Sequence, residues 1–409
     1  MAKDTLPEAF TSYTRELMGE ERYERLVAAL SEEAPVSIRL NPLKTKGMTV
    51  SPEWAEEHVD WCDEGYYLKN RPDFTFDPLL HAGVYYVQEA SSMFISHVLR
   101  TLVDRSVTML DLCAAPGGKS TAARAVLPEG SMLYSNEPIR TRAHILAENM
   151  EKWGHRDVVV TNAYPRDYSR SGMMFDVILC DVPCSGEGMF RKDEGAIREW
   201  SVANVKKCQQ LQREIITEAM KCLKPGGYLI YSTCTYNAHE NEENIAWMTA
   251  EYGLTPVVIP TEESWGITGP LTGDLSLPLY RFIPGYTRGE GLFMAALHNT
   301  ASGNHYMAES RTGGKKKKKD KDDSDIHVVE PSLQKEGPLI DVDYATAIAY
   351  LRGEAVALPA DAPRGMVTIG YHGFALGGAK NIGNRANNLY PKAWRIRSQV
   401  THQEQNIII

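Results

Sequence analysis

Hydrophobic positions between residues 107 and 234 follow two alternating periods. Short runs rich in β-branched and aromatic residues are separated by longer stretches with apolar residues three or four apart. The short runs are VTMLDLC (107–113), SMLYSNE (131–137), DVVVTNA (157–163), FDVILCD (175–181) and GGYLIYSTC (226–234). This alternation predicts right-handed βαβ units, and hence an α/β fold with a doubly wound, mostly parallel, Rossmann-like sheet. YRFIP (280–284) and GLFMAAL (291–297) are expected to add edge strands.

The segments on either side have different patterns. Residues 6–45 predict two short amphipathic helices and a strand, a small α+β module, and a further helix is expected to start near Glu89 to Ser91. Residues 301–335 are polar and charge-blocked, which predicts a linker. Its run Lys315 to Lys319 is either a solvated tether or an attraction for RNA phosphate. Beyond it, DYATAIAYLRGEAVAL (343–358) predicts a helix followed by short, glycine-broken strands. The expected domains are therefore 1–80, 81–300, 301–335 and 336–409.

Composition limits the class of protein. A chain of 409 residues exceeds what one core usually organises, and no apolar run reaches the roughly 20 residues that a membrane span needs. The first residues carry no apolar signal core, so we expect a cytoplasmic protein without a membrane partner, and a monomer. Seven scattered cysteines without Cys-x-x-Cys spacing argue against a disulfide framework and a zinc site, so no metal is expected. The net charge of −9 leaves a nucleic-acid partner open.

The segment DLCAAPGGKS (111–120) lies between the first predicted strand and its helix, where parallel sheets bind ligands. Gly117 and Gly118 allow the backbone to approach a bulky ligand without a β-carbon in the way. The segment lacks the Gly-x-Gly-x-x-Gly pattern and the spacing of a phosphate loop, which disfavours a dinucleotide or a nucleoside triphosphate. The candidate cofactor contacts here are Cys113, Ala114, Ala115, Pro116, Gly117, Gly118, Lys119 and Ser120.

Two further polar residues end the next strands. Glu137, at the end of the second strand, could accept both hydroxyls of a ribose, or be a turn acid exposed to solvent. Asn162, at the end of the third, could contact an adenine edge, although asparagine there is as often a turn former. A ribose acceptor without a phosphate loop suggests S-adenosylmethionine as the cofactor.

Two cysteines follow the fourth and fifth strands. Cys184 stands in DVPCSGEGMF (181–190) and Cys234 ends YSTCT (231–235). Because consecutive parallel strands usually lie side by side, both thiols should emerge at one ligand-binding edge, on opposite flanks of a single pyrimidine. The alternative, a small buried hydrophobic side chain, is the expected state of Cys180, Cys208 and Cys222.

This arrangement suits methylation at carbon 5 of a pyrimidine. That carbon is a poor nucleophile until a thiolate adds at carbon 6 and makes the ring an enamine, which is a form of covalent catalysis. Asp181 could protonate or hydrogen-bond ring nitrogen 3 if burial keeps it protonated. Methyltransferases that act on exocyclic amines need no thiol.

Three segments together carry a family resemblance. DLCAAPGGKS, DVPCSGEGMFRKD and YSTCTYNAHENEENI resemble the RNA (cytosine-5)-methyltransferases of the Nol1/Nop2/Sun class. GVYYVQEASSM looks like the RNA-facing segment of that class, and LYPKAWRI is similar to the PUA-like RNA-binding module of bacterial members that act on the small ribosomal subunit. The resemblance implies an S-adenosylmethionine-dependent enzyme that methylates cytosine in RNA, with small-subunit rRNA or an assembling small subunit as its partner.

The resemblance also implies residue roles. Cys234 corresponds to the nucleophile, Cys184 to the cysteine that assists breakdown of the adduct, and Lys119 and Asp181 to cofactor-site and base-contacting residues. This chain departs from the class at Val182, where proline or alanine is usual, and at Asn162, where an acid often holds adenine; Asp167 lies further along.

Other functions compete with this one. A DNA cytosine methyltransferase is disfavoured because no Glu-Asn-Val motif follows Cys184 and the C-terminal module is short. A non-catalytic RNA-binding assembly factor, or an enzyme acting on tRNA, remains an alternative. Candidate RNA contacts are Tyr85, Tyr86, Arg191, Lys192, Tyr390 and Lys392.

Overall fold

The computed structural model describes residues 6–300, 326–333, 335–400 and 403–409. The chain divides into two compact units, and each draws on segments far apart in sequence. The first unit contains the chain up to Pro35 together with Glu89–Ala143 and Asp157–Val329. The second contains Val36–Gln88, His144–Arg156 and Glu330–Ile409. The two helices and the strand predicted at the start of the chain are present, but the helices belong to the first unit and the strand to the second.

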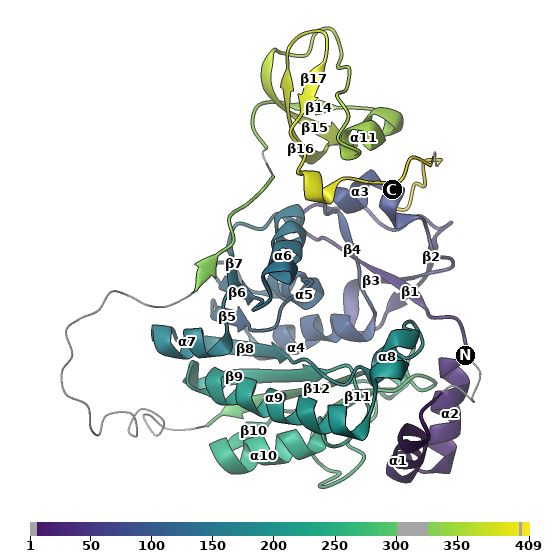
Figure 1. Cartoon of the computed structure of the whole chain (residues 1–409), viewed down its shortest axis with the longest axis vertical. Helices are drawn as coiled ribbons and strands as arrows, with labels where there is room; N and C mark the ends of the chain where they lie inside the picture. Colours follow the sequence, from purple (N-terminus) through teal and green to yellow (C-terminus); the bar gives the residue numbers. More distant parts are fainter. Residues whose placement is uncertain (1–5, 301–325, 334, 401–402) are drawn as a thin grey trace, which may run out of the picture. The chain divides into compact units, whose positions relative to one another are not determined.

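The first unit is built on one large sheet with the strand order β10-β12-β9-β8-β5-β6-β7-β13 (Figure 1). The five strands from β7 to β9 in this order pair in parallel, which confirms the predicted doubly wound sheet. The parallel strands are β5 Thr108–Asp111, β6 Met132–Asn136, β7 Val158–Asn162, β8 Phe175–Asp181 and β9 Leu223–Thr233. The antiparallel strands are β10 Leu254–Pro256, β11 Tyr280–Phe282, β12 Leu292–Asn299 and β13 His327–Val328.

Two strand predictions need correction. β12 is not an edge strand, because it lies between β9 on one side and β10 and β11 on the other. The predicted linker contributes strand β13, which pairs with the end of β7 and is continued by a hydrogen bond from Val329 N to Val160 O of 2.9 Å. The Lys315 to Lys319 run lies outside the described residues.

Helices flank the large sheet. They are α1 Glu8–Met18, α2 Glu20–Leu30, α4 Phe94–Leu102, α5 Gly118–Val126, α6 Arg140–Trp153, α7 Pro165–Ser171, α8 Glu194–Glu199, α9 Val202–Met220 and α10 Glu242–Tyr252. α9 and α10 pack into one hydrophobic core with the central strands, and α4 and α5 contact each other on the opposite side of the sheet (Figure 1). The helix predicted to start near Glu89 to Ser91 begins later: Ser91–Met93 form a 3-10 turn, and α4 starts at Phe94. The Glu89 carboxylate accepts hydrogen bonds from the Ser91 and Ser92 amides of that turn, both at 3.0 Å.

The second unit contains two four-stranded sheets. Their orders are β2-β3-β1-β4, which is antiparallel, and β14-β15-β16-β17. The strands are β1 Val36–Leu40, β2 Ala55–Val59, β3 Cys62–Leu68, β4 Tyr85–Val87, β14 Leu339–Asp341, β15 Gly365–Tyr371, β16 Phe374–Asn381 and β17 Ala386–Asn388. The helices are α3 Pro78–His81 and α11 Tyr344–Leu351, besides the second half of α6. One hydrophobic core joins residues of both sheets, so the segment 36–88 folds together with the C-terminal segment.

The C-terminal helix is shorter than its sequence pattern. α11 ends at Leu351 rather than near 358, because Gly353 takes a left-handed conformation with φ of 89° and the chain leaves the helix there. Over the described ranges, no helix combines the length and the apolar character needed to cross a membrane.

Candidate active site

The carboxyl ends of β5, β8 and β9 bring the predicted site residues to one edge of the large sheet. These strands are direct neighbours in the sheet, and the Asp181 Cα is paired with Ser232 in the parallel register. Gly117 adopts φ of 115° where the loop after β5 turns into α5, a conformation that L-residues with a β-carbon rarely adopt. This turn begins α5 beside the ends of β5 and β8.

A buried hydroxyl and carboxylate support the loop after β5. Asp111 and Ser120 are fully buried, and the Ser120 hydroxyl donates to the Asp111 carboxylate at 2.6 Å. Burial raises the pKa of Asp111 to about 7, against the lowering effect of the Ser120 hydrogen bond. Burial also raises the pKa of Cys113 far above its usual range. Ser120 therefore uses its hydroxyl inside the fold, where it fixes the loop.

Lys119 and Asp181 form the charged pair of the site. Lys119 Nζ donates to Asp181 Oδ2 at 2.9 Å, and Ser232 Oγ donates to the other carboxylate oxygen at 2.7 Å. Burial acts to lower the pKa of Lys119, but the adjacent Asp181 carboxylate outweighs it, so the pKa is raised. The Asp181 side chain is 32% exposed and paired with a cation. Both oxygens of the Asp181 carboxylate thus accept a hydrogen bond within the site.

Cys184 and Cys234 come together as the strand order predicts. Their Sγ atoms lie 3.0 Å apart, both are free thiols, and both residues are partly exposed. The Cys234 amide also donates to Cys184 Sγ at 3.3 Å. The expectation that the two sulfurs flank a pyrimidine from opposite sides is wrong in this arrangement, because sulfurs in contact leave no room for a ring between them. The hydrogen bond with Cys234, followed by burial, raises the pKa of Cys184 well above its ordinary value.

Two buried glutamates join the segments that carry these cysteines. Glu187, three residues after Cys184, accepts hydrogen bonds from Thr235 Oγ1 at 2.6 Å and from the amides of Tyr236 and Asn237 at 2.6 and 2.9 Å. Glu240, on the Cys234 segment, accepts in turn from the Ser185 amide at 3.1 Å. Each carboxylate thus binds residues adjacent to the other cysteine. We call Glu187 and Glu240 the carboxylate clasp.

Further donors nearby form hydrogen bonds to the two carboxylates of the clasp. Asn237 Nδ2 donates to Glu187 Oε1 at 3.0 Å and to Glu240 Oε1 at 2.8 Å, so one amide bridges the two carboxylates. Trp200 Nε1 donates to Glu187 and Gln212 Nε2 to Glu240. Burial raises the pKa of Glu240, partly offset by these hydrogen bonds. Sequence reasoning missed the clasp; the polar residues of SGEG and NAHENEEN, set beside apolar strands, were the available signal.

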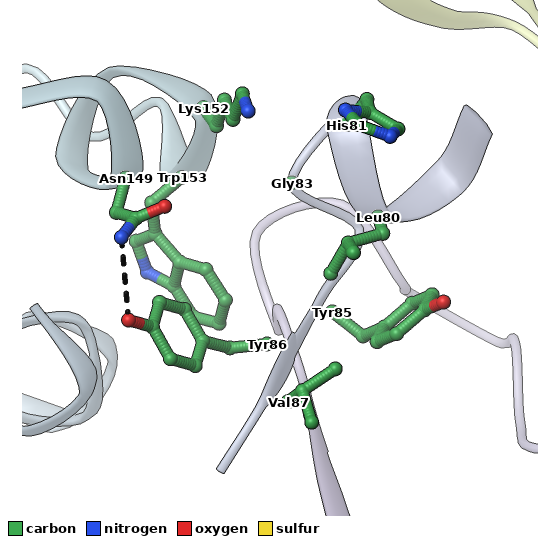
Figure 2. A pocket seen from close by; sticks show the side chains of 9 residues that line it. All are labelled: Leu80, His81, Gly83, Tyr85, Tyr86, Val87, Asn149, Lys152 and Trp153. Carbon is green, nitrogen blue, oxygen red and sulfur yellow. Dashed lines mark hydrogen bonds between the residues drawn. The ribbon is translucent and has the colours of Figure 1, made fainter. Parts of the chain in front are cut away.

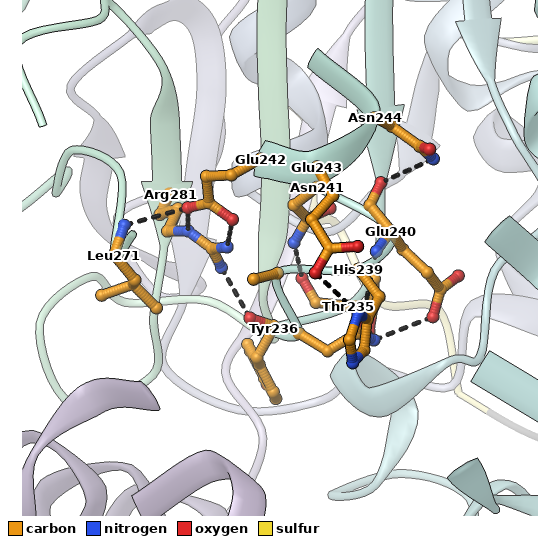
Figure 3. Close-up of polar contacts among 12 residues, drawn as sticks. Thr235, Tyr236, His239, Glu240, Asn241, Glu242, Glu243, Asn244, Leu271 and Arg281 are labelled. Carbon is orange, nitrogen blue, oxygen red and sulfur yellow. Dashed lines mark hydrogen bonds and ion pairs between the residues drawn. The ribbon is translucent and has the colours of Figure 1, made fainter. Parts of the chain in front are cut away.

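A second buried network holds the segment after Cys234 (Figure 3). Arg281 on β11 is 1% exposed, forms a two-point ion pair with Glu242, and donates to the Tyr236 carbonyl at 2.8 Å. Asn241 Nδ2 donates to the Thr235 carbonyl at 3.0 Å. Figure 3 shows these side chains converging on the turn between β9 and α10. The backbone that follows Cys234 is therefore held by buried ion pairs and hydrogen bonds rather than left as an open loop.

The remaining cofactor candidates lie at the ends of β6 and β7. Glu137 is 2% exposed, accepts from the Ile139 amide at 2.9 Å and lies 3.4 Å from Arg142 Nη1. Arg142 also donates to the Ala115 carbonyl at 3.0 Å, which links the two loops. Asn162 donates its amide to the carbonyls of Glu137 and Pro138 at 2.7 and 2.9 Å, the behaviour of a turn former. Asp167 caps α7 by accepting from the Tyr164 amide.

Three candidate RNA contacts are wrong. Tyr85 and Tyr390 are each 1% exposed, and Tyr85 donates its hydroxyl to Asp77 at 2.6 Å. Arg191 is buried in a two-point ion pair with Glu290. Lys192 and Lys392 are exposed and Tyr86 is half-buried, so these three stay candidates. Aromatic and basic residues in a sequence cannot be sorted into core and surface until the tertiary contacts are known.

The chain matches known methyltransferase domains along most of its length. Residues 101–298 match the family described as 16S rRNA methyltransferase RsmB/F. Residues 6–90 match the N-terminal domain of 16S rRNA methyltransferase RsmF, and residues 338–396 match the methyltransferase RsmF PUA domain. The chain belongs to the RsmB/F methyltransferase family. All candidate site residues from Cys113 to Cys234 lie inside the first of these matches.

Curated relatives of this RsmB/F family member carry a consistent name. "Ribosomal RNA small subunit methyltransferase F" of Cronobacter sakazakii is 35% identical over 310 residues, 73% of this chain and 64% of that protein. The protein of the same name from an Escherichia coli strain is 34% identical over 315 residues, with 73% and 65% covered. The chain thus spans a little under two thirds of the length of these relatives.

Solved structures share the fold of this RsmB/F family member. A methyltransferase homolog protein from Pyrococcus horikoshii superposes with a TM-score of 0.60 at 24% identity, over 73% of this chain and 100% of that one. NSun6 from Pyrococcus horikoshii with SFG gives a TM-score of 0.60 at 18% identity, over 74% and 100%. At these identities the likeness establishes the methyltransferase fold.

Proposed function

We propose that this chain transfers a methyl group from S-adenosylmethionine to carbon 5 of a cytosine in RNA, through a covalent adduct on Cys234. The observation that carries the proposal is the contact between the Cys184 and Cys234 sulfurs, 3.0 Å apart at the carboxyl end of a doubly wound sheet. A methyltransferase acting on an exocyclic amine has no use for a paired thiol, whereas an aromatic carbon needs a nucleophile to activate it.

The residues present fit S-adenosylmethionine. The buried Glu137 carboxylate at the end of β6 is placed to accept the ribose hydroxyls, and the left-handed turn at Gly117 lets the backbone approach the ligand. Arg142, 48% exposed, has to move away from Glu137 for a ribose to bind there. When bound, S-adenosylmethionine supplies an electrophilic methyl group. This assignment makes Glu137 the ribose residue and leaves Asn162 to form the turn.

Cys234 begins the reaction as a thiolate. It adds to carbon 6 of the cytosine and forms a carbon–sulfur bond, while the π electron pair of the carbon 5–carbon 6 bond makes carbon 5 a nucleophile. Carbon 5 would then take the methyl group that S-adenosylmethionine supplies, and the electron pair of the broken methyl–sulfur bond would stay on the donor sulfur, leaving S-adenosylhomocysteine. The Cys184 thiol, whose raised pKa keeps it protonated, donates its S–H to the Cys234 thiolate before attack. The Lys119 ammonium is the donor beside the ring, and the Asp181 carboxylate accepts from the cytosine amino group.

Cys184 becomes the base only after the adduct has formed. The largest cause of the raised pKa of Cys184 is its hydrogen bond with Cys234. Alkylation turns the Cys234 sulfur into a thioether, which is a weaker acceptor, so this hydrogen bond is weakened in the adduct. Cys184 then passes its proton to water at this partly exposed position, and its thiolate takes the proton from carbon 5. The ring regains its aromaticity as the bond between carbon 6 and Cys234 breaks and the electron pair returns to sulfur.

The substrate is proposed to be small-subunit rRNA, free or in an assembling subunit. The support is the name of the curated relatives and the match of residues 338–396 to an RsmF PUA domain. Chemistry on carbon 6 requires access to the face of the cytosine, so the base has to leave its stack before Cys234 attacks.

Replacing each cysteine in turn should give a different outcome and so distinguish the roles of the two thiols. We expect Cys234→Ala to abolish methyl transfer without forming an adduct, because no nucleophile remains. Cys184→Ser should form the adduct but stall, because a serine hydroxyl is too weak a base to take the carbon 5 proton. Denaturing gel electrophoresis with labelled rRNA detects the adduct as a shifted band, and Cys208→Ser, a partly exposed thiol on α9, is the matched control. An adduct that accumulates on Cys234→Ala while Cys184→Ser turns over would show that the roles are reversed.

A further inference from the structure

A cavity of about 230 Å³ lies in the second unit, whereas the paired cysteines belong to the first (Figure 2). It is formed by the strand β4, the residues just before it, and the last turn of α6. β4 is the edge strand of its sheet, bonded on one side to β1. The lining side chains are mostly aromatic or polar, with few aliphatic ones. A void left by imperfect packing is normally apolar, so this lining calls for another explanation.

One side of the cavity is made of aromatic rings and an amide. Tyr86 and Trp153 lie beside each other, and Figure 2 shows the Tyr86 hydroxyl and the Asn149 amide at the same end of these rings. Asn149 Nδ2 donates to the Tyr86 hydroxyl over 3.4 Å, at the long limit of a hydrogen bond. Trp153 is 1% exposed, and among the described residues its Nε1–H has no hydrogen-bond partner. Buried indole N–H groups usually have one.

His81 lines another part of the cavity. His81 Nε2 lies 2.8 Å from the Thr75 carbonyl, which fixes a proton on that nitrogen and leaves Nδ1 as an acceptor. Burial lowers the pKa of His81 to about 4, with the nearby Lys152 charge adding to the effect, so the ring is neutral at physiological pH. Within the described part of the chain, His81 Nδ1 is buried and has no partner. Two residues of the cavity lining, Trp153 and His81, thus each keep a buried polar nitrogen without a partner among the described residues.

A cation lies at the rim and is held in place. Lys152 forms an ion pair with Glu148 and lies 5.1 Å from the centroid of the Trp394 ring. Arg39 covers one face of Trp153 at 4.5 Å. These contacts keep the aromatic wall rigid, so a ligand meets preformed ring faces rather than mobile side chains.

We propose that this cavity binds one unstacked nucleobase of the RNA substrate, at a position other than the methylated cytosine. A base is flat, can stack on the ring of Tyr86, and carries at its edge both donors and acceptors for the Asn149 amide. Proteins recognise single-stranded RNA in this way, by stacking and by contacts to base edges. The proposal rests on the proposed function, which supplies RNA as the ligand.

The test measures binding rather than methyl transfer. The full chain with Cys234→Ala is titrated into fluorescein-labelled single-stranded RNA nonamers of A, C or U, and binding is followed by fluorescence anisotropy. Tyr86→Leu should weaken binding about tenfold, because base–aromatic stacking has this order of effect. Asn149→Ala should weaken one homopolymer more than the others, since the amide contacts a base edge. Tyr66→Leu, at a half-buried tyrosine on β3 of the same sheet that does not line the cavity, should bind like the parent.

Ultraviolet cross-linking of the same Cys234→Ala chain to the nonamers, followed by mass spectrometry, locates the base without any change in the pocket. A nucleotide attached to Tyr86 or Trp153 supports the proposal. Cross-links found only outside the lining, or a Tyr86→Leu chain that binds like Tyr66→Leu, would overturn it. Neither readout depends on turnover, so an inactive native chain that still cross-links at Tyr86 would refute the proposed function and leave this site standing.

Discussion

Replacement of Glu187 tests whether the carboxylate clasp sets the position of the two thiols. Glu187→Gln keeps the size and one acceptor oxygen but removes the charge and places an N–H₂ group among donors. Three donors converge on Glu187 Oε2, and they belong to the residues that directly follow Cys234. We expect this variant to fold, to shift the Cys234 segment away from Cys184, and to lose most methyl transfer.

The magnitude follows from the number of contacts. In Glu187→Ala the Tyr236 and Asn237 amides and the Trp200 indole lose a buried acceptor. Each buried donor left without a partner costs about 1–3 kcal/mol, so a loss of about 3–9 kcal/mol is possible. That range overlaps the whole stability of a typical domain, about 5–15 kcal/mol. Glu187→Gln retains part of these bonds, so its loss should be about 2–4 kcal/mol, in line with the cost of one or two unpaired buried donors.

Three measurements separate a displacement of the two thiols from a general loss of folding stability. Denaturant unfolding gives the free energy of unfolding, adduct formation reports attack by Cys234, and mass spectrometry after brief iodoacetamide treatment gives the alkylation rate of each cysteine. Glu199→Gln, an exposed glutamate on α8, is the control and should match the native chain in all three. A Glu187→Gln chain with native stability, native alkylation rates and full adduct formation would refute the reasoning, because the clasp would then be dispensable.

Two other predictions concern pH and oxidation. Burial raises the pKa of Asp111 to about 7 in the folded chain, against an ordinary value of 3.8, so its contribution to stability is complete below about pH 4 and is lost as pH rises through 7. Asp111→Asn should therefore lose less stability than the native chain between pH 5 and pH 8 in denaturant titrations, and equal slopes would contradict the assignment. Because the free thiols of Cys184 and Cys234 are in contact, diamide should oxidise them to a disulfide, with their two electrons and two protons passing to the reagent. Peptide mapping should find residues 184 and 234 linked and methyl transfer restored by dithiothreitol; a native chain that stays reduced while Cys208 is modified would contradict the observed contact.

The sequence shows which residues form most of the strands. It does not always show which strands are neighbours in the sheet. The five parallel strands are buried on both faces and therefore consist of short apolar runs, which the local sequence pattern is enough to identify. β12 has an equally apolar pattern, but only the pairing of Phe293 with Thr233 puts it inside the sheet. Strand β13 could not be predicted, because a strand of two residues in a charged segment has no hydrophobic periodicity.

The candidate site divides in the same way. Cys184, Cys234 and Asp181 were identifiable because strand ends in a doubly wound sheet meet at one edge. Glu187, Glu240 and Arg281 were not, because a charged residue is normally exposed and nothing local shows that its partner lies tens of residues away. Tyr85 and Arg191 failed as RNA contacts for the converse reason, since each is paired inside the fold with Asp77 or Glu290.

The sequence by itself determined the doubly wound sheet, the loop after its first strand and the presence of two thiols at neighbouring strand ends, since these depend on periodicity and on the geometry common to parallel sheets. The tertiary structure alone decided that the sulfurs touch, that two buried carboxylates hold their segments together, and that the segment 36–88 shares one core with the C-terminal segment. Distances and burial depend on contacts between residues far apart in the chain, and these are fixed only when the whole fold closes.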